Sequence, residues 1–314
     1  MMPGCLMGGS RGLWRFRIPG RLPAVPVAES ASDTSNMTDI AARERRSLSI
    51  FHWTGREVVR LLGGFRGMLS LGLITLSVLL TQRRRASKVI SPLIWREVLR
   101  SGVRPVPIVL FLSSLLGLAV IGQTVVFTTR LGAQDYLGTV MVMVVVRELG
   151  PMLAALVVLV RAGSESVIEL GSARASHEIE AMEAIGIDPI HYWVVPRVLG
   201  MALGVFCLTV YAIVAAVLSG YLWAFLQNIP ILPGDYFGQL ARALHPLDFL
   251  ALGLKSGILG VTLALLLCYH GLAQPIRRED IPRAAIRALT QGVVLCVLID
   301  AVFLALSRIS LDSP

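Results

Sequence analysis

Long stretches without a single charged residue constrain this chain more than any other feature. Residues 105–129 and 198–234 contain no Asp, Glu, Lys or Arg. A helix crosses the roughly 30 Å hydrocarbon core of a bilayer with about 20 apolar residues, so each stretch is long enough to span a membrane. Across the chain 55% of residues are apolar and 16% are charged, whereas roughly 25% are charged in a soluble domain. The sequence therefore predicts an integral membrane protein and argues against a soluble enzyme.

Five stretches fit membrane-spanning helices, which predicts an all-α integral membrane protein. The second stretch is interrupted only by the adjacent pair Arg147 and Glu148. The five predicted spans are residues 105–129, 136–160, 196–223, 247–271 and 285–307.

A sixth apolar stretch, residues 58–80, contains Arg60 and Arg66 and is followed by three consecutive arginines. This composition favours a helix lying in the membrane interface over a sixth span, because basic flanks contact anionic headgroups. Residues 1–53, which precede this stretch, are either a disordered leader or a start that was placed too early, with Met37 as the true initiator. The chain thus divides into this leader, a cytoplasmic interfacial-helix region (54–104) and a five-span domain (105–310).

The distribution of Lys and Arg predicts the orientation. With five spans, one side receives the N-terminal region and the loops after the second and fourth spans, and nearly all basic residues fall there. The opposite side receives only Arg130, Arg242 and Arg308. Because basic loops stay cytoplasmic, we expect a cytoplasmic N-terminus and a periplasmic C-terminus.

Several chemistries lack their motifs in this sequence. The only lysines are Lys88 and Lys255, and neither follows a glycine, so a Walker A loop that would hold ATP is absent. His177-Glu178 begins like a zinc-protease HExxH motif, but residue 181 is alanine. The sequence contains no CxxC spacing of the kind that indicates a metal site. The net charge is +9, but the basic residues lie between apolar runs rather than together on a face that would bind nucleic acid. If ATP drives this protein, another chain hydrolyses it, and we expect no cofactor, metal or nucleic acid here.

The segment after the second span predicts a short amphipathic helix at about residues 173–188. Ser172 or Ser176 is suited to cap its start, and Gly186 followed by Pro189 is suited to end it. Its apolar stripe is Ile179, Met182 and Ile185, and its acidic surface is Glu178, Glu180 and Glu183. Such a helix either docks into the groove of a soluble partner or rests on the membrane as a connector. The acidic surface favours docking, because anionic headgroups repel it.

Several motifs occur in an order typical of one family. They are Val-Arg-Glu-Leu-Gly-Pro (146–151), Arg-Ala-Gly-Ser (161–164), Glu-Leu-Gly (169–171), Glu-Ala-Met (180–182) and Gly-Ile-Asp-Pro (186–189). From about Thr54 to Ser310 the chain resembles the MlaE/YrbE family of permease subunits in lipid-transporting ABC systems. Two positions depart from the family pattern: His177-Glu178 replaces a usual Glu-Gln, and Glu165 replaces a small residue.

The resemblance implies an interfacial helix, five spans, a homodimer and a location in the bacterial inner membrane. It also implies a cytoplasmic ABC ATPase that docks on the 173–188 helix, a periplasmic MCE-domain protein and a small STAS-type accessory subunit. The implied substrate is phospholipid, moved between the inner and outer membranes to maintain outer-membrane lipid asymmetry.

Four charges stand alone inside the predicted spans: Arg147, Glu148, Lys255 and Asp300. An unpaired charge near the bilayer centre costs at least about 2.5–3.5 kcal/mol, so such residues pair or face water. The four either form a salt-bridge cluster that fixes helix register or form a charged layer that changes pairing as a transporter cycles, and we expect both roles. Either Asp300 or Glu148 is suited to pair with Lys255.

The first span carries a stripe at helical spacing: Val120, Gln123, Thr124, Phe127 and Leu131. Such a stripe is typical of plain helix packing. In the resembled family the same part of the span lines the lipid cavity.

Two other functions fit the residues. The intramembrane acids would serve as proton sites in a stand-alone ion-coupled carrier. Alternatively, the chain would be a structural membrane anchor that recruits a cytoplasmic complex.

Overall fold

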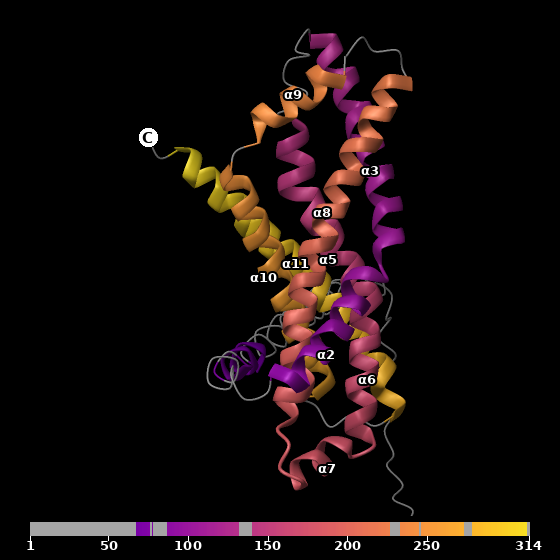
Figure 1. Ribbon diagram of the computed structural model, residues 1–314, viewed down its shortest axis with the longest axis vertical. Coiled ribbons are helices and arrows are strands. Elements are labelled where there is room, and N and C mark those ends of the chain that lie inside the picture. The colour runs from indigo at the N-terminus through magenta and orange to yellow at the C-terminus, as the bar shows by residue number, and fades with distance from the viewer. Residues whose placement is uncertain are drawn as a thin grey trace, which may run out of the picture. The chain divides into compact units, whose positions relative to one another are not determined.

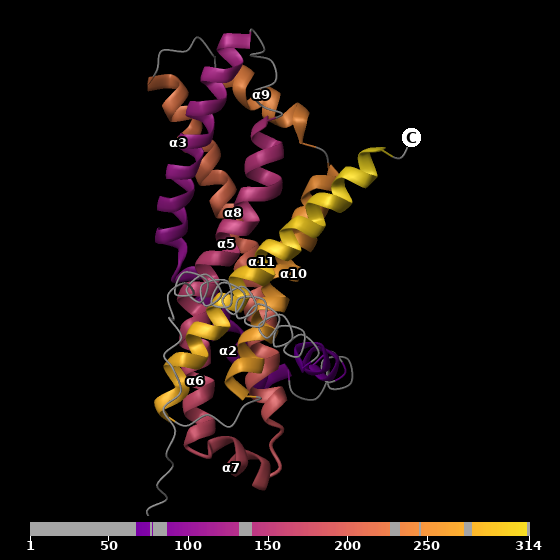
Figure 2. The same cartoon turned by 180° about the vertical axis from the view of Figure 1, so that it is seen from behind.

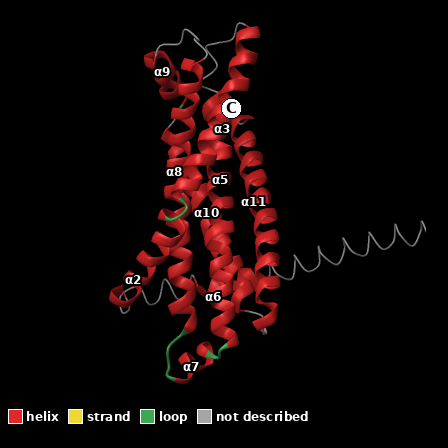
Figure 3. Ribbon diagram, turned by 90° about the vertical axis from the view of Figure 1, so that its right-hand side faces the viewer, coloured by secondary structure: helices red, strands yellow, loops and turns green. Residues whose placement is uncertain are grey.

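The computed structural model describes residues 67–75, 77, 87–131, 140–226, 233–244, 246–272 and 278–312. The predicted leader and most of residues 54–86 lie outside these ranges. Within them every regular element is a helix and none is a strand, as Figure 3 shows. Five stretches are long and apolar enough to cross a membrane, which confirms the predicted number. They are Ser91–Thr124, Val142–Ala175, Ile190–Leu226, Pro246–Leu272 and Arg278–Ser307.

Several of these stretches join more than one helical segment (Figure 1). The first begins within α2 (Ser87–Val98), passes through the π-helical η1 (Leu99–Val103) and ends within α3 (Val106–Leu131). The second contains η3 (Val142–Leu149), α5 (Gly150–Val158), η4 (Leu159–Gly163) and α6 (Ser164–Ala175). The remaining elements are α7 (Glu178–Ala184), η5 (Ile190–Val194), α8 (Val195–Leu226), α9 (Pro233–Ala243), α10 (Pro246–Leu272), η6 (Arg278–Asp280) and α11 (Ile281–Asp312).

Pro105 separates α2 and η1 from α3. Without an N–H it cannot donate to the carbonyl of Ser101, so the helix is interrupted there. Its own carbonyl accepts the first bonds of α3, from the N–H groups of Ile108 and Val109. As a result α2 leans away from the direction of α3 in Figures 1 and 3.

Helix α8 is central and packs against α2, α3, α5 and α10. Small residues allow this close approach: a Cβ added at Gly117 would lie 2.2 Å from the carbonyl oxygen of Ala216. The main core centres on the fully buried Leu159, Met201 and Leu267. A second cluster forms where α3, α8 and α9 meet, around Ile121 and Tyr236. Figures 1 and 2 show α7 and α9 at opposite ends of these helices.

Residues 67–75 and 77 are the described part of the predicted interfacial helix. The position of Gly67 adjoins the ring of Tyr269, and that of Gly72 adjoins Leu265, so this helix packs on α10. Leu69, Leu73 and Ile74 are exposed. Whether this helix lies in the interface, and which membrane face holds each terminus, stay predictions.

Candidate functional site

The intramembrane charges converge from three elements, η3, α10 and α11. The Lys255 ammonium lies 2.6 Å from a carboxylate oxygen of Glu148 and 2.6 Å from one of Asp300. Arg147 pairs instead with Asp248, at 2.9 Å. Lys255 is only 5% exposed, and a buried charge of this kind is tolerated because it is paired. The structure thus brings together all four predicted residues and shows that both candidate partners of Lys255 contact it.

Asp248 is the member that sequence reasoning missed. It precedes Lys255 by seven residues on α10, which places both side chains on one helix face. That spacing was the available signal that Asp248 belongs with Lys255. However, Asp248 lies near the start of a span, where an acid exposed to solvent is also common. With it, the cluster holds three acids and two bases rather than the balanced set of four that we expected.

The backbone of the second span also takes part in the cluster. Pro151 has no N–H, so the carbonyl of Arg147, four residues earlier, has no α-helical donor. Lys255 Nζ donates a hydrogen bond to this carbonyl over 2.8 Å. The π-helical η3 ends beside Pro151, and π-helical turns are frequent at functional sites. The Arg-Glu-Leu-Gly-Pro motif therefore supplies an arginine, a carboxylate and a backbone carbonyl to one site.

A cavity of about 100 Å³ adjoins the cluster. Arg147, Glu148, Asp248 and Lys255 line its polar side, and Phe303 lies on its apolar side. A space of this size admits a few water molecules but not a whole lipid. In the described ranges no group of three or more His, Cys, Asp or Glu side chains is placed to hold a metal ion.

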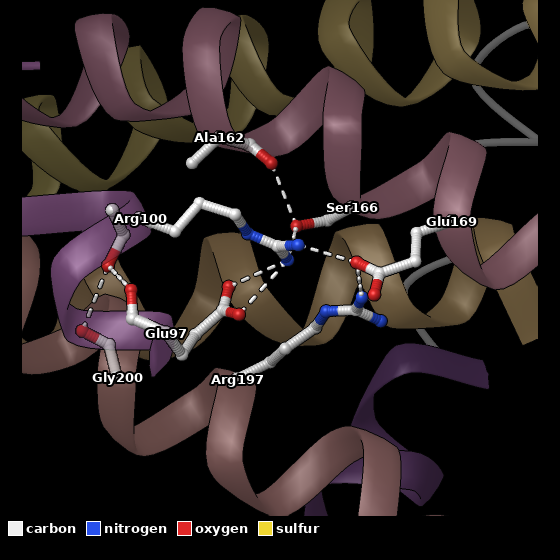
Figure 4. A network of polar contacts seen from close by, with 8 residues as sticks. Glu97, Arg100, Ala162, Ser166, Glu169, Arg197 and Gly200 are labelled. Carbon is white, nitrogen blue, oxygen red and sulfur yellow. Dashed lines mark hydrogen bonds and ion pairs between the residues drawn. The ribbon is translucent and has the colours of Figure 1, made fainter. Parts of the chain in front are cut away.

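A second charged network ties α2 and η1 to α6 and α8 (Figure 4). Arg100 contacts Glu97 at 3.0 Å and Glu169 at 2.5 Å. Glu169 also accepts a hydrogen bond from Arg197 over 2.6 Å, and Ser166 accepts one from Arg100 over 3.0 Å. Arg197 is 4% exposed. Sequence reasoning missed this network, because nothing in the spacing of these residues indicates which spans lie side by side.

The predicted 173–188 helix is divided in two. Helix α6 ends at Ala175, His177 adopts a left-handed conformation with φ 59°, and α7 then covers Glu178–Ala184. The predicted cap at Ser172 or Ser176 is wrong, because both hydroxyls donate to carbonyls of α6 instead. The predicted end is confirmed: the N–H of Gly186 (φ 82°) donates to Glu183, and that of Ile187 donates to Met182. These two bonds form a Schellman motif.

The three residues of the predicted apolar stripe, Ile179, Met182 and Ile185, differ in their exposure. Ile179 is 4% exposed and belongs to the main core, Met182 is partly buried, and Ile185 is 72% exposed. Ile179 therefore anchors α7 to its own chain, which leaves Ile185 as the apolar side chain open to a partner. Glu178, Glu180 and Glu183 are exposed, and Glu180 pairs with His177 at 2.6 Å.

The first-span stripe is only partly described. Gln123 is exposed, and Val120 packs against the second core cluster. The Thr124 hydroxyl donates to the Val120 carbonyl over 2.7 Å. The side chains of Phe127 and Leu131 lie outside the described residues. Neither the cavity at the charged cluster nor the groove beside Arg100 described below is lined by this stripe.

Comparisons with known proteins find relatives in bacteria and in a plant. A probable ABC transporter permease protein of Rickettsia conorii is 28% identical over 206 residues, covering 66% of this chain and 79% of its own. The chloroplastic protein TRIGALACTOSYLDIACYLGLYCEROL 1 of Arabidopsis thaliana is 28% identical over 217 residues, covering 66% of this chain and 60% of its own. The intermembrane phospholipid transport system permease protein MlaE of Haemophilus influenzae is 22% identical over 220 residues, covering 68% and 82%.

The family described as Permease MlaE matches residues 94–306. This range contains all five charged residues of the intramembrane cluster and the whole of α7. The chain belongs to the MlaE family of ABC transporter permeases.

Proposed function

We propose that this chain is the membrane-spanning subunit of an ABC transporter that moves phospholipid between the inner and outer membranes and so maintains outer-membrane lipid asymmetry. Family membership and the name of the Haemophilus relative support phospholipid as the substrate. The observation that carries the proposal is the cluster around Lys255, where one buried ammonium contacts carboxylates from two different spans.

This geometry suits a pairing that changes during transport. Asp300 lies on α11. In the most apolar 18-residue stretch of this span 11% is buried, against 28% or more in the corresponding stretches of the other spans. If α11 moves away, Lys255 keeps its contacts with Glu148 and the Arg147 carbonyl. The lysine then stays compensated, which avoids the several kcal/mol that an isolated buried charge would cost. The cost of the movement then falls on Asp300, the carboxylate that loses its partner.

We assign ATP hydrolysis to a separate cytoplasmic ABC ATPase, because the sequence has no Walker A loop. The exposed end of α7, with Ile185 and three glutamates, supports docking of that ATPase there. Membership of the family supports assembly as a homodimer. An inner-membrane location, a periplasmic MCE-domain protein and a STAS-type accessory subunit complete the proposed system.

The decisive experiment neutralises the Lys255 contacts together. The variant Glu148→Gln, Lys255→Met, Asp300→Asn removes one cation and two anions and leaves the Arg147–Asp248 pair in place. We expect it to accumulate in the membrane and retain its ATPase, but to lose most lipid transport in proteoliposomes that contain the whole system. The matched control is Asp280→Asn with Arg283→Gln, which removes an exposed pair separated by 3.4 Å. Transport close to that of the control would contradict the proposal.

A further inference from the structure

A groove of about 560 Å³ separates α2 and η1 from α6. One wall carries Trp95, Arg96 and Arg104, and the opposite wall carries Glu165 and Ile168. The Arg100–Glu169 pair, drawn in Figure 4, lines the groove between them. This groove shares no residue with the cavity at the Lys255 cluster.

Both walls lie at the depth where lipid headgroups meet protein. On one side, the charge-free stretch of α3 begins directly after Arg104. On the other, residues 149–160 carry no charge, and charged residues resume at Arg161. Each wall therefore begins where an apolar membrane-spanning stretch ends, at the level of the interface.

The charges of the groove leave an unneutralised positive site. Arg100 is neutralised by Glu97 and Glu169. Arg96 and Arg104 are exposed, and in the described part of the chain their side chains have no ion pair or hydrogen bond. Against them stands one free acid, Glu165. The groove therefore has one net positive charge, which matches the single negative charge of a phosphodiester.

Apolar side chains at the same groove indicate a lipid rather than a free phosphate. Trp95 is 64% exposed, Ile168 is 48% exposed and Leu99 is 39% exposed, and all three line the groove. Exposed tryptophan is typical of the membrane interface, where its ring lies at the headgroup level. Basic pockets between membrane helices bind phosphate-bearing headgroups.

We infer that this groove binds the phosphodiester headgroup of a glycerophospholipid from the adjoining leaflet, with Arg96 and Arg104 contacting the phosphate. The first acyl carbons lie against Trp95, Leu99 and Ile168. The site is separate from the Lys255 cluster and does not depend on which lipid the transporter moves.

A photoreactive lipid tests the assignment at the groove itself. The full chain is purified in detergent, stripped of lipid and titrated with phosphatidylglycerol that carries a diazirine near the start of one acyl chain. Crosslinks are then counted by mass spectrometry on the peptides that contain residues 92–104 and 165–169. Diacylglycerol with the same diazirine, which lacks the phosphodiester, should give little crosslinking there. Soluble glycerol 3-phosphate should not compete at the concentrations where the lipid binds.

Three variants in the groove and one control outside it test the roles of the charges. Arg96→Gln with Arg104→Gln should weaken the apparent affinity about tenfold, since hydrogen bonds to charged groups are lost. Arg96→Lys with Arg104→Lys should remain within about threefold of the wild type, because lysine keeps the charge and binds phosphate as a point charge. Glu165→Gln should tighten binding a few-fold, because it removes the one free acid. Arg283→Gln, a cation outside the groove that is 78% exposed, should change nothing.

Equal crosslinking in the double glutamine variant and the wild type would overturn the assignment, as would weaker binding in Glu165→Gln. Competition by glycerol 3-phosphate would reassign the groove to free phosphate. Unchanged elution on size exclusion and an unchanged melting temperature are expected for all variants, because Arg96, Arg104 and Glu165 are exposed.

Discussion

Lys255 Nζ lies 2.8 Å from the backbone carbonyl oxygen of Arg147, a carbonyl that Pro151 leaves without an α-helical donor. An ammonium group has three N–H donors. Two of them are used, toward this carbonyl and toward Glu148, while Asp300 lies 2.6 Å away as an ion pair whose carboxylate oxygen Oδ1 accepts no hydrogen bond. Lysine at this position is therefore a structural requirement as well as a proposed participant in transport.

Removing Lys255 alone should destabilise the protein. Lys255→Met leaves the carboxylates of Glu148 and Asp300 close together without their cation, at an expected cost of about 3–5 kcal/mol. The melting temperature of the purified variant in detergent should fall clearly below that of the wild type. Adding Glu148→Gln and Asp300→Asn should restore most of it. A single variant as stable as the wild type would show that the ion pairs contribute little.

Glu169 should matter more to stability than its neighbour Glu165. Glu169→Gln removes the carboxylate that contacts both Arg100 and Arg197, so Arg197, whose guanidinium also lies 5.4 Å from the ring centroid of Trp193, loses a charged partner. We expect a loss of about 3 kcal/mol, because an almost fully buried guanidinium loses its counter-charge. Glu165→Gln, one turn away and exposed, should change stability by less than about 0.5 kcal/mol. Thermal melts of the two variants side by side measure the difference.

Aspartate substitutions at the exposed Ile185 and at the buried Ile179 should distinguish an effect on partner binding from an effect on folding. Ile185→Asp changes an exposed side chain, so the protein should fold normally while its ATPase is lost on affinity purification of the complex. Ile179→Asp places a charge in the core and should lower expression and melting temperature. Normal recovery of the ATPase with Ile185→Asp would place the docking contact elsewhere.

The end of α7 should be sensitive to a single methyl group. Gly186 has φ 82°, a conformation that costs other residues roughly 1–2 kcal/mol. Gly186→Ala should therefore destabilise the protein by about 1 kcal/mol, although nothing lies within 4 Å of the added carbon. Gly238→Ala in α9, which also adds a methyl group to open space, should stabilise it by up to about 1 kcal/mol through helix propensity. Opposite shifts in melting temperature are the expected result.

Tyr236 should make stability depend on alkaline pH. Burial raises the pKa of its phenol to about 12, above the ordinary value of about 10. The folded state thus holds this proton more tightly, so the stabilisation is present below pH 10 and is lost as the pH rises from about 10 to about 12. Melting temperatures across this window should fall more steeply for the wild type than for Tyr236→Phe. Parallel curves would show that the phenol ionises as freely when folded as when unfolded.

The features that could be predicted are those that depend on the residues of one continuous segment of the sequence. Five apolar stretches of sufficient length predicted the number of spans, and lone charges such as Lys255 had to be paired because the bilayer gives them no alternative. Gly186 marked the end of α7, since only glycine takes a left-handed conformation without cost.

The features that could not be predicted depend on which spans are neighbours. Asp248 joins the cluster only because α10 packs beside η3, and Arg197 meets Glu169 only because α6 and α8 converge. The inward direction of Ile179 follows from the break at His177, which rotates α7 relative to α6. The spacing of Asp248 and Lys255 marks a shared helix face, but a single sequence does not show which elements lie beside one another.

The two ion pairs between η3 and α10 have a mechanical consequence. Arg147 and Glu148 on one element meet Asp248 and Lys255 on the other, so the elements are joined at two points along their lengths. A slide of α10 by one helical turn, about 5.4 Å, would separate both pairs at once, whereas a displacement of α11 separates only the contact of Lys255 with Asp300. The two ion pairs therefore oppose shear between the second and fourth spans, whereas in the described part of the chain a single ion pair, Lys255–Asp300, links the fourth span to the fifth.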